Sequence, residues 1–489
     1  MGAVRNRHCM ALLIGALALS GCQSLDVSSD ADFKPSSNPM TVDTVMRSDS
    51  LANLARRQHP KIVQTYGGEY SDPKLERMLA RVVGKLSQDP ENPSQTYRIT
   101  ILDSPNINAF ALPGGYLYVT RGILALANDS AEIAAVLAHE MAHVTANHGL
   151  ERQRREAEAT LASRVVDEVL SSDKRAQAAV WRGKLQLAQF SRNQELAADA
   201  IGIATIGRVG YDPYAAARFL QSMDAYQKFY SVKGENDASL DFLASHPNAP
   251  RRIELAQRHA RQFGMPGTGE RDRTPFLEGI DGLLYGDKPD QGYVRGRDFL
   301  HPTLGVAFSV PEGFVIDNSA GEVVAAGPGE LAFRFDGATV PRSLSLTDYL
   351  QDGWLAGLDT GTVQATTING HEAASARAYA GEWQFDVMVV RVGDQVYRLL
   401  TGAPRGSNQL EPVARAISNS FRVLNPAERA ALKPLRIRVL TVRPGDTVAT
   451  FANQMVGVDR KMDLFRLLNG LGPGANLSAG DRVKIVTDR

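Results

Sequence analysis

Residues 129–144, with the sequence DSAEIAAVLAHEMAHV, decide how the central part of this chain folds. Asp129 is followed three residues later by Glu132, a spacing that caps the N-termini of helices. After this start, apolar residues recur at helical spacing, at Ile133, Val136, Leu137, Met141 and Val144. The pattern therefore predicts a helix. Because residues four apart lie one above the other on a helix, His139 and His143 converge on one point.

The sequence from His139 to His143, HEMAH, predicts a zinc site. Two converging imidazoles are ligands that zinc takes, and the carboxylate of Glu140 beside them is placed to act on a metal-bound water. The alternative is a solvated helix face, which is the usual setting of a lone His-Glu pair. A catalytic zinc needs a third protein ligand and an open position, so a further carboxylate or imidazole must be found.

Glu195 is the predicted third ligand, within a second helical stretch. Asp199 lies four residues further on the same face, where it can accept the free ring N–H of a ligand histidine and fix its orientation. Surface charge is the alternative for this pair. His148 is expected on the opposite side of the first helix and is excluded as a ligand. Small residues on the second stretch permit close helix packing, namely Ala197, Ala198, Ala200, Gly202, Ala204 and Gly207.

Length and composition indicate a soluble globular protein of about three domains. The chain has 489 residues, of which 43% are hydrophobic and 22% charged. Lys and Arg together number 54, as do Asp and Glu, so the formal net charge is zero. A nucleic-acid-binding protein normally carries a basic surface, and we therefore exclude nucleic-acid partners. The cysteines, Cys9 and Cys22, both lie near the N-terminus, which leaves none for a disulfide or metal site downstream.

Residues 1–21 are predicted to be a lipoprotein signal peptide. Residues 11–19 form an apolar run too short to span a bilayer. The run ends in Leu-Ser-Gly before Cys22, which resembles the lipobox of bacterial lipoproteins and implies cleavage before Cys22 and its lipidation. The following Gln23 resembles the outer-membrane-sorted kind, and residues 22–45 have the composition of a tether. A plain secretory peptide with an accidental cysteine is the alternative.

After the tether we expect an α+β multidomain protein. Residues 46–262 have helical periodicity and are predicted to form a mainly helical domain with a small sheet. Residues 263–297 begin with a Gly- and Pro-punctuated break and are predicted to be a linker.

Residues 298–425 change to short β-type runs. Residues 385–392 and 395–400 predict a hairpin, and amphipathic segments at 345–358 and 410–420 predict helices packed on the sheet. The pattern resembles PsbP-like α+β domains, and we expect a binding or spacer domain here.

Residues 426–436 are a second predicted linker, and residues 437–487 resemble the LysM module. The resemblance rests on VRPGDT at 442–447, LLNGL at 467–471 and GDRVKI at 480–485. It implies a small βααβ domain that binds the N-acetylglucosamine backbone of peptidoglycan.

Four segments of residues 50–260 resemble, in order, the BepA/LoiP-like peptidases, which are related to the HtpX, OMA and CAAX-protease families. The first is NAFALPGGY at 108–116, followed by the helix of His139 and then the helix of Glu195. The last is Ser245-His246-Pro247 with Arg251-Arg252-Ile253. The soluble periplasmic BepA/LoiP branch fits best. The gluzincin arrangement that this resemblance implies has His139, His143 and Glu195 on zinc.

The resemblance also implies roles for the remaining residues. Glu140 is the general base and then acid, and Asp199 orients a ligand. His246 is implied at the metal, in its open position at rest or as an oxyanion stabiliser, with Arg252 as a further active-site residue; bracing of the following helix is the alternative for His246. The resemblance implies a strand that pairs with the substrate at Asn108, Ala109, Phe110 and Ala111. The alternative is a core hairpin strand, and the same residues can serve both purposes.

These predictions combine into an outer-membrane-anchored periplasmic zinc endopeptidase that acts in quality control of envelope proteins. Its expected substrates are unfolded or outer-membrane proteins, because cleavage requires an extended and accessible chain. The alternative is a lipid-anchored chaperone or scaffold that binds peptides and peptidoglycan without proteolysis, for which an intact Glu140 would be unnecessary. A peptidoglycan hydrolase is a third possibility that the catalytic block does not resemble.

Overall fold

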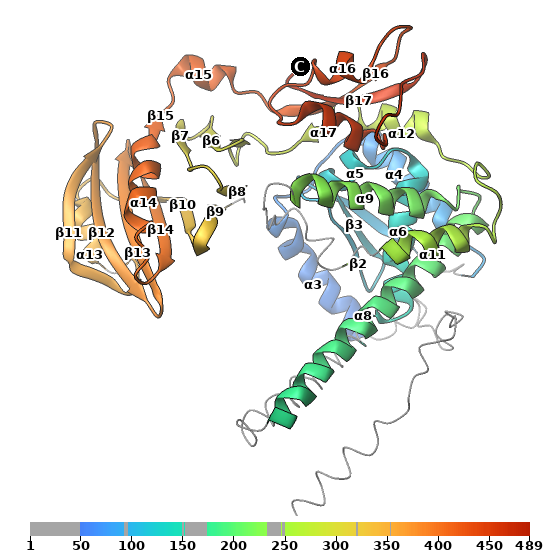
Figure 1. The fold of residues 1–489 in the computed structure, drawn as a ribbon, viewed down its shortest axis with the longest axis horizontal. Helices are drawn as coiled ribbons and strands as arrows, with labels where there is room; N and C mark the ends of the chain where they lie inside the picture. The colour runs from blue at the N-terminus through green and yellow to red at the C-terminus, as the bar shows by residue number, and fades with distance from the viewer. Residues whose placement is uncertain are drawn as a thin grey trace, which may run out of the picture. The chain divides into compact units, whose positions relative to one another are not determined.

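The computed structural model (Figure 1) describes residues 49–91, 96–148, 151, 174–231, 246, 250–318, 321–352 and 354–489. The predicted signal peptide, Cys22 and the tether lie outside these residues. Within the described residues, no helix has both the length and the apolar character that a membrane crossing requires.

The first part of the described chain is helical and contains a small sheet, as predicted for residues 46–262. The sheet has the strand order β1-β3-β2, with β1 parallel and β2 antiparallel to β3, so β2 lies at an edge of the described sheet. The elements are α3 (Asp49–Thr65), α4 (Pro73–Leu86), β1 (Arg98–Leu102), β2 (Ala109–Leu112), β3 (Tyr116–Thr120), α5 (Arg121–Leu126), α6 (Ser130–Thr145), α8 (Lys174–Arg208), α9 (Ala215–Ser231) and α11 (Pro250–Ala260).

The predicted helix at residues 129–144 is α6, and its start is fixed by two side chains. The Asp129 carboxylate accepts a hydrogen bond from the N–H of Glu132 at 2.9 Å. The Glu132 carboxylate accepts from the N–H of Asn128 at 2.8 Å, one residue before the partner that a capping box predicts. Every residue from Ser130 to Ala142 is buried, so the HEMAH sequence enters the protein interior.

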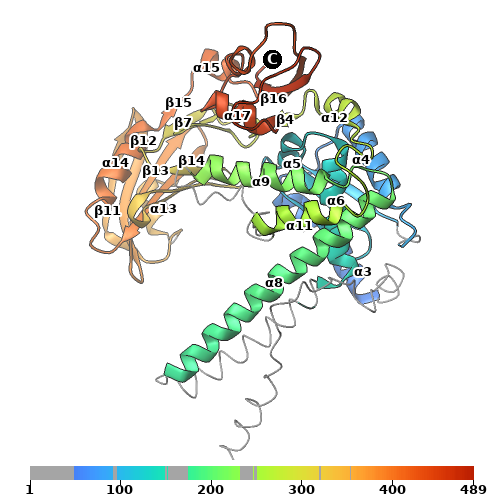
Figure 2. The ribbon, with the colours of Figure 1, turned by 45° about the vertical axis from the view of Figure 1, so that its right-hand side comes forward.

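The predicted close packing of α8 on α6 occurs at Gly202. A Cβ added to Gly202 would lie 3.0 Å from the backbone N of His139 and 3.3 Å from the carbonyl carbon of Ala138. These distances are tighter than most Cβ contacts, so glycine is the residue that fits this approach without a shift of the backbone. The last turns of α8 lie beside α6 and α11 (Figure 2), and this contact carries Glu195 and Asp199 to the HEMAH sequence.

The sheet-rich part contains the predicted hairpin, in which Val392 pairs with Gln395. Its larger sheet has the order β11-β12-β13-β14-β10-β9-β8, and a smaller one has the order β15-β7-β6-β5. The helix predicted at 410–420 is present, and the one predicted at 345–358 is shorter. The elements are β5 (Tyr293–Arg295), β6 (Asp298–His301), β7 (Val306–Ser309), β8 (Val315–Asn318), β9 (Val323–Ala326), η2 (Pro328–Glu330), β10 (Ala332–Thr339), α13 (Leu346–Gln351), β11 (Leu358–Ile368), β12 (His371–Ala380), β13 (Trp383–Val392), β14 (Gln395–Pro404), α14 (Leu410–Ser420) and β15 (Arg422–Val423).

The C-terminal elements follow in the order strand, helix, helix, strand. They are β16 (Leu435–Thr441), α16 (Val448–Ala452), α17 (Lys461–Leu468) and β17 (Arg482–Thr487), preceded by α15 (Pro426–Ala431). The expected linker at 263–297 contains α12 (Arg273–Ile280) and β4 (Leu284–Tyr285), and β4 pairs with β16 to extend the sheet that β16 forms with β17.

Lys484 of β17 joins this C-terminal region to the peptide that leads into α6. Its side chain is fully buried, and Nζ donates hydrogen bonds to the carbonyls of Ala125, Leu126 and Ala127 at 2.8, 3.2 and 2.6 Å. Burial lowers the pKa of Lys484, and the nearby Glu132 carboxylate opposes that shift. The three carbonyls end α5, where cations are favoured by the helix dipole.

We predict that Lys484→Met lowers the free energy of unfolding by about 3 kcal/mol, because three buried carbonyls lose their hydrogen-bond donor. Lys461→Met in α17 is the matched control, since Lys461 is exposed, and it should change stability by less than about 0.5 kcal/mol. Urea unfolding of both variants measures the difference. Equal midpoints for the two variants would show that the Lys484 contacts do not stabilise the fold.

Candidate metal centre

Four side chains from three segments converge near the C-terminal end of α6. His139 and His143 come from α6, Glu195 comes from α8, and His246 is the fourth. One ligand atom from each lies within 4.8 Å of all the others. The two Nε2 atoms of the α6 histidines are 3.0 Å apart. The Glu195 oxygens are 3.5 Å from His139 Nε2 and 3.3 Å from His143 Nε2.

This donor set fits a divalent metal. Two imidazole nitrogens and a carboxylate are the ligands of catalytic zinc sites, which take three protein ligands and keep a further position. Without a cation, the convergence of these side chains in a buried site would leave their lone pairs facing one another. Burial opposes ionisation of Glu195, but hydrogen bonds from His139, His143 and His246 and the charge of His139 outweigh it and lower its pKa, so this ligand is a carboxylate.

Asp199 and Arg252 support the ligands from behind. Asp199 Oδ1 is 3.0 Å from His139 Nδ1, the ring nitrogen that faces away from the cluster. Arg252 donates to both Asp199 oxygens, at 2.7 and 2.8 Å, and its Nη1 lies 3.1 Å from Glu195 Oε2. Burial opposes ionisation of Asp199, but Arg252 and His139 outweigh it and hold its pKa at about 2. Arg252 thus connects the predicted orienting carboxylate to the predicted third ligand.

His246 lies inside the cluster rather than on its border. Its Nδ1 is 3.1 and 3.0 Å from the two Glu195 oxygens and 3.3 Å from His139 Nε2. Its Nε2 is 3.7 Å from Glu140 Oε1. This placement matches a fourth donor at the same point.

Glu140 faces the same point with one oxygen unsatisfied. Its Oε1 is buried and has no hydrogen-bond partner among the described residues. Burial raises the pKa of Glu140, and the charges of His246 and His139 lower it by less. A carboxyl group with a raised pKa can accept and then return a proton near neutral pH.

The prediction for His148 is wrong in one respect. The residue was expected on the far side of the α6 helix, but α6 ends at Thr145 and Asn147 has a positive φ of 56°. The chain therefore turns back, and His148 Nδ1 lies 3.0 Å from His143 Nδ1. His148 is not one of the four clustered donors; it contacts a ligand from behind, as Asp199 does. Asn147 was the signal in the sequence for this turn, because asparagine adopts the left-handed conformation that ends a helix more readily than most residues.

The predicted substrate strand is the edge strand β2 with the residue before it. Asn108 holds this strand in place, because its Nδ2 donates to the hydroxyl of Tyr66 at 2.9 Å. Ala109 is buried, Ala111 is half-buried, and the ring of Phe110 stacks on Tyr118 with centroids 4.7 Å apart. The strand therefore packs into the core on one side, lies beside α6 and ends the described sheet at its edge. The core and edge interpretations are both compatible with this placement.

Comparison with known proteins shows what the part of the chain around this site is similar to. Residues 71–260 match Peptidase family M48. The chain is 29% identical over 249 residues to a beta-barrel assembly-enhancing protease of Yersinia pestis, covering 45% of this chain and 49% of that protein. It is 25% identical over 262 residues to the Escherichia coli protein of that name, covering 52% and 51%. It is 29% identical over 217 residues to mitochondrial metalloendopeptidase OMA1 of Schizosaccharomyces pombe, covering 42% and 59%.

The chain spans about half the length of the curated relatives it matches. Among solved structures, cyanobacterial PsbP from Synechocystis is 14% identical and covers 28% of this chain and 98% of its own, with a TM-score of 0.22. A Bacteroides thetaiotaomicron structure gives 11% identity, 40% and 87% coverage and a TM-score of 0.25. Scores this low carry no argument, so the PsbP-like and LysM-like assignments remain predictions.

The matched range contains the whole cluster, from the HEMAH helix to His246 and the supporting Arg252. The predicted resemblance to BepA-like peptidases is confirmed by relatives that carry that name. The ligand geometry and the sequence match agree, since residues 71–260 are similar to Peptidase family M48 and contain the four clustered donors.

Proposed function

We propose that this chain is a zinc-dependent endopeptidase that hydrolyses peptide bonds of unfolded or misassembled envelope proteins. The observation that carries the proposal is the convergence of His139, His143 and Glu195 beside a buried Glu140 oxygen without a hydrogen-bond partner among the described residues. The names of the relatives support an activity in outer-membrane protein assembly. The donor set fits a divalent metal, and we propose zinc because two imidazoles with one carboxylate are a ligand set of catalytic zinc sites.

The proposed roles follow from the contacts of each residue. Bound zinc supplies Lewis acidity, which polarises the scissile carbonyl and favours ionisation of water. Glu140 takes the proton from the attacking water and returns it to the leaving amine. Asp199 lies 3.0 Å from His139 Nδ1 and orients that ring, and Arg252 donates to Asp199 and holds it in place.

An extended substrate segment would add to the outer edge of β2, with main-chain hydrogen bonds to residues 109–112. Edge strands accept peptides in this way independently of most side chains. Such binding suits unfolded polypeptides, whose backbone groups are free, and disfavours folded ones.

The location and the further contacts are also proposals. Lipidation at Cys22 would hold the enzyme on the outer membrane facing the periplasm, as the lipobox-like sequence indicates. The LysM-like sequence of residues 437–487 supports binding to peptidoglycan, and the names of the relatives support an envelope setting.

Glu140→Gln should abolish most proteolysis and leave metal binding intact. The change keeps the side-chain shape and all ligands but removes the base, for which a loss of about 10²–10⁴ in rate is typical. Degradation of an unfolded outer-membrane protein and metal content per chain are measured together.

Two control variants accompany this measurement. Glu254→Gln, at an exposed position of α11, should behave like the unmodified protein, and His143→Ala should lose both metal and activity. Full proteolysis by metal-loaded Glu140→Gln would contradict the mechanism. The non-enzymatic scaffold would show no difference between Glu140→Gln and Glu254→Gln in any assay.

His246→Ala should raise the basal rate several-fold at unchanged zinc content. We assign His246 to the open position at rest, because its Nδ1 lies within hydrogen-bonding distance of both Glu195 oxygens. Removing it frees that position for water and substrate. Initial rates and bound zinc are compared with those of His371→Ala, a histidine substitution in β12. A fall in rate at equal zinc content would instead assign His246 to stabilisation of the oxyanion.

Cys22→Ala should release the protein from the outer-membrane fraction or leave it unprocessed, because the acyl chains that anchor it would have no attachment point. Membrane fractionation and electrophoretic mobility report the outcome. A variant that still fractionates with outer membrane at unchanged mobility would rule out the lipoprotein assignment.

A further inference from the structure

His148 contacts the metal cluster without belonging to it. Its Nδ1 lies 3.0 Å from Nδ1 of His143, and the two rings meet edge to face with centroids 4.9 Å apart. Only 8% of His148 is exposed. The other nitrogen of His143, Nε2, faces the cluster and lies 3.3 Å from Glu195 Oε1. The His143 ring therefore lies between the predicted third ligand on one side and His148 on the other.

The positions of these nitrogens determine where the proton of the His143 ring belongs. A histidine that binds a metal through Nε2 carries its proton on Nδ1, and that N–H needs an acceptor that fixes the ring. A neutral imidazole carries a proton on one nitrogen and accepts at the other. His148 can therefore accept the Nδ1 proton of His143 at its own Nδ1, with its own proton on Nε2.

The acceptor at His143 differs in charge from the one at the other α6 ligand. His139 has the carboxylate of Asp199 3.0 Å from its Nδ1, whereas His143 has an imidazole. A neutral acceptor fixes the ring without adding negative charge, and like charges oppose one another in a buried site. This matters because three carboxyl groups already lie around the cluster, those of Glu140, Glu195 and Asp199.

The backbone of His148 is held by the helix that carries the predicted third ligand. The α6 helix ends at Thr145, and the positive φ of Asn147 turns the chain back. Gln194 Nε2 donates a hydrogen bond to the carbonyl oxygen of His148 at 3.1 Å, and both residues are buried. Gln194 directly precedes Glu195 in α8. One segment of α8 thus supplies a metal-site carboxylate and also holds the residue behind His143.

We propose that His148 is a positioning residue of the metal centre. Its Nδ1 accepts the Nδ1 proton of His143 and keeps Nε2 of that ring directed at the metal, and Gln194 holds His148 in place for this contact. A residue that only filled space would serve equally well with any side chain of similar shape. The inference rests on the proposed function in one respect, since zinc is the metal used to test it.

Two substitutions separate the acceptor from the shape of the side chain. His148→Asn places an amide oxygen near the position of Nδ1, whereas His148→Leu has the same branched shape and no acceptor. The full-length protein is titrated with Zn²⁺ in competition with a chelator. His148→Leu should weaken zinc binding about tenfold, and His148→Asn should bind zinc nearly as tightly as the unmodified protein. Equal zinc affinities of the two variants would overturn the assignment.

Proton NMR of the zinc-loaded protein gives a second readout that side-chain shape does not change. An Nδ1 proton of His143 that is bonded to His148 exchanges slowly with water and should give a resolved imidazole N–H signal. His148→Asn should keep this signal and His148→Leu should lose it. Persistence of the signal in zinc-loaded His148→Leu would contradict the proposed hydrogen bond.

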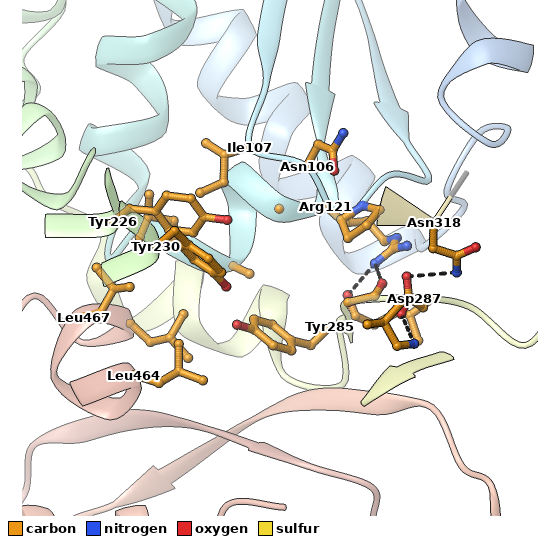
Figure 3. Close-up of a pocket in the computed structure, with 18 of the residues that line it drawn as sticks. Asn106, Ile107, Arg121, Tyr226, Tyr230, Tyr285, Asp287, Asn318, Leu464 and Leu467 are labelled. Atoms are coloured by element: carbon orange, nitrogen blue, oxygen red, sulfur yellow. Dashed lines mark hydrogen bonds between the residues drawn. The ribbon is translucent and has the colours of Figure 1, made fainter. Parts of the chain in front are cut away.

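Asn318→Leu is the matched control, since it also replaces a hydrogen-bonded polar side chain by leucine. Asn318 donates from Nδ2 to Asp287 at 3.3 Å and to the carbonyl oxygen of Gly292 at 3.1 Å. It lines a cavity of about 180 Å³ (Figure 3), which none of the four clustered donors lines. The control should keep the zinc affinity of the unmodified protein. Equal weakening by Asn318→Leu and His148→Leu would reduce the effect to lost stability and overturn the proposal.

Gln194→Met tests the link to α8, because methionine keeps the unbranched shape and removes the donor. The single variant should weaken zinc binding, and the double variant with His148→Leu should bind no more weakly than His148→Leu alone, since the two residues act through one contact. A double variant with the product of the two separate effects would overturn the link. Absence of proteolysis in every variant would refute the proposed function, while the zinc titrations still decide the role of His148.

Discussion

The close packing of α8 on α6 is the constraint on which the metal cluster depends. Glu195 has a short side chain, and it reaches the two histidines only because Gly202 lets the helix backbones approach to van der Waals distance. A Cβ at that position would lie 3.0–3.3 Å from the α6 backbone, so a larger residue would require the two helices to shift by a few tenths of an ångström. The contact with α8 also helps to bury α6 from Ser130 to Ala142, and burial raises the pKa of Glu140.

The sequence was sufficient for features set by local periodicity. The α6 helix, its two histidines and the small-residue face of α8 follow from spacing alone. What it could not supply was the path of the chain where a helix ends. His148 was misplaced because spacing assumes that the helix continues, whereas the left-handed Asn147 reverses the chain toward His143. The position of Arg252 between Asp199 and Glu195 depends on the packing of α11 on α8, which no local pattern encodes.

The C-terminal region shows the same limit in tertiary structure. Its strand-helix-helix-strand order was implied by the resemblance to the LysM module, but its burial of Lys484 against the carbonyls of residues 125–127 was not. A lysine in a strand is ordinarily expected to face solvent. Here the apolar residues of this region belong to one hydrophobic cluster with those of α4, α5 and α6. The two ends of the described chain therefore share a core.

The pairing of β4 with β16 gives the sheet-rich part the topology of a very long hairpin loop. Tyr285 is the register partner of Leu435, so the chain leaves and returns at adjacent positions. The entropy of closing a loop grows only with the logarithm of its length, at roughly 0.6 kcal/mol per doubling. The chain between these two residues can thus change in length at little entropic cost to the pairing of β4 with β16.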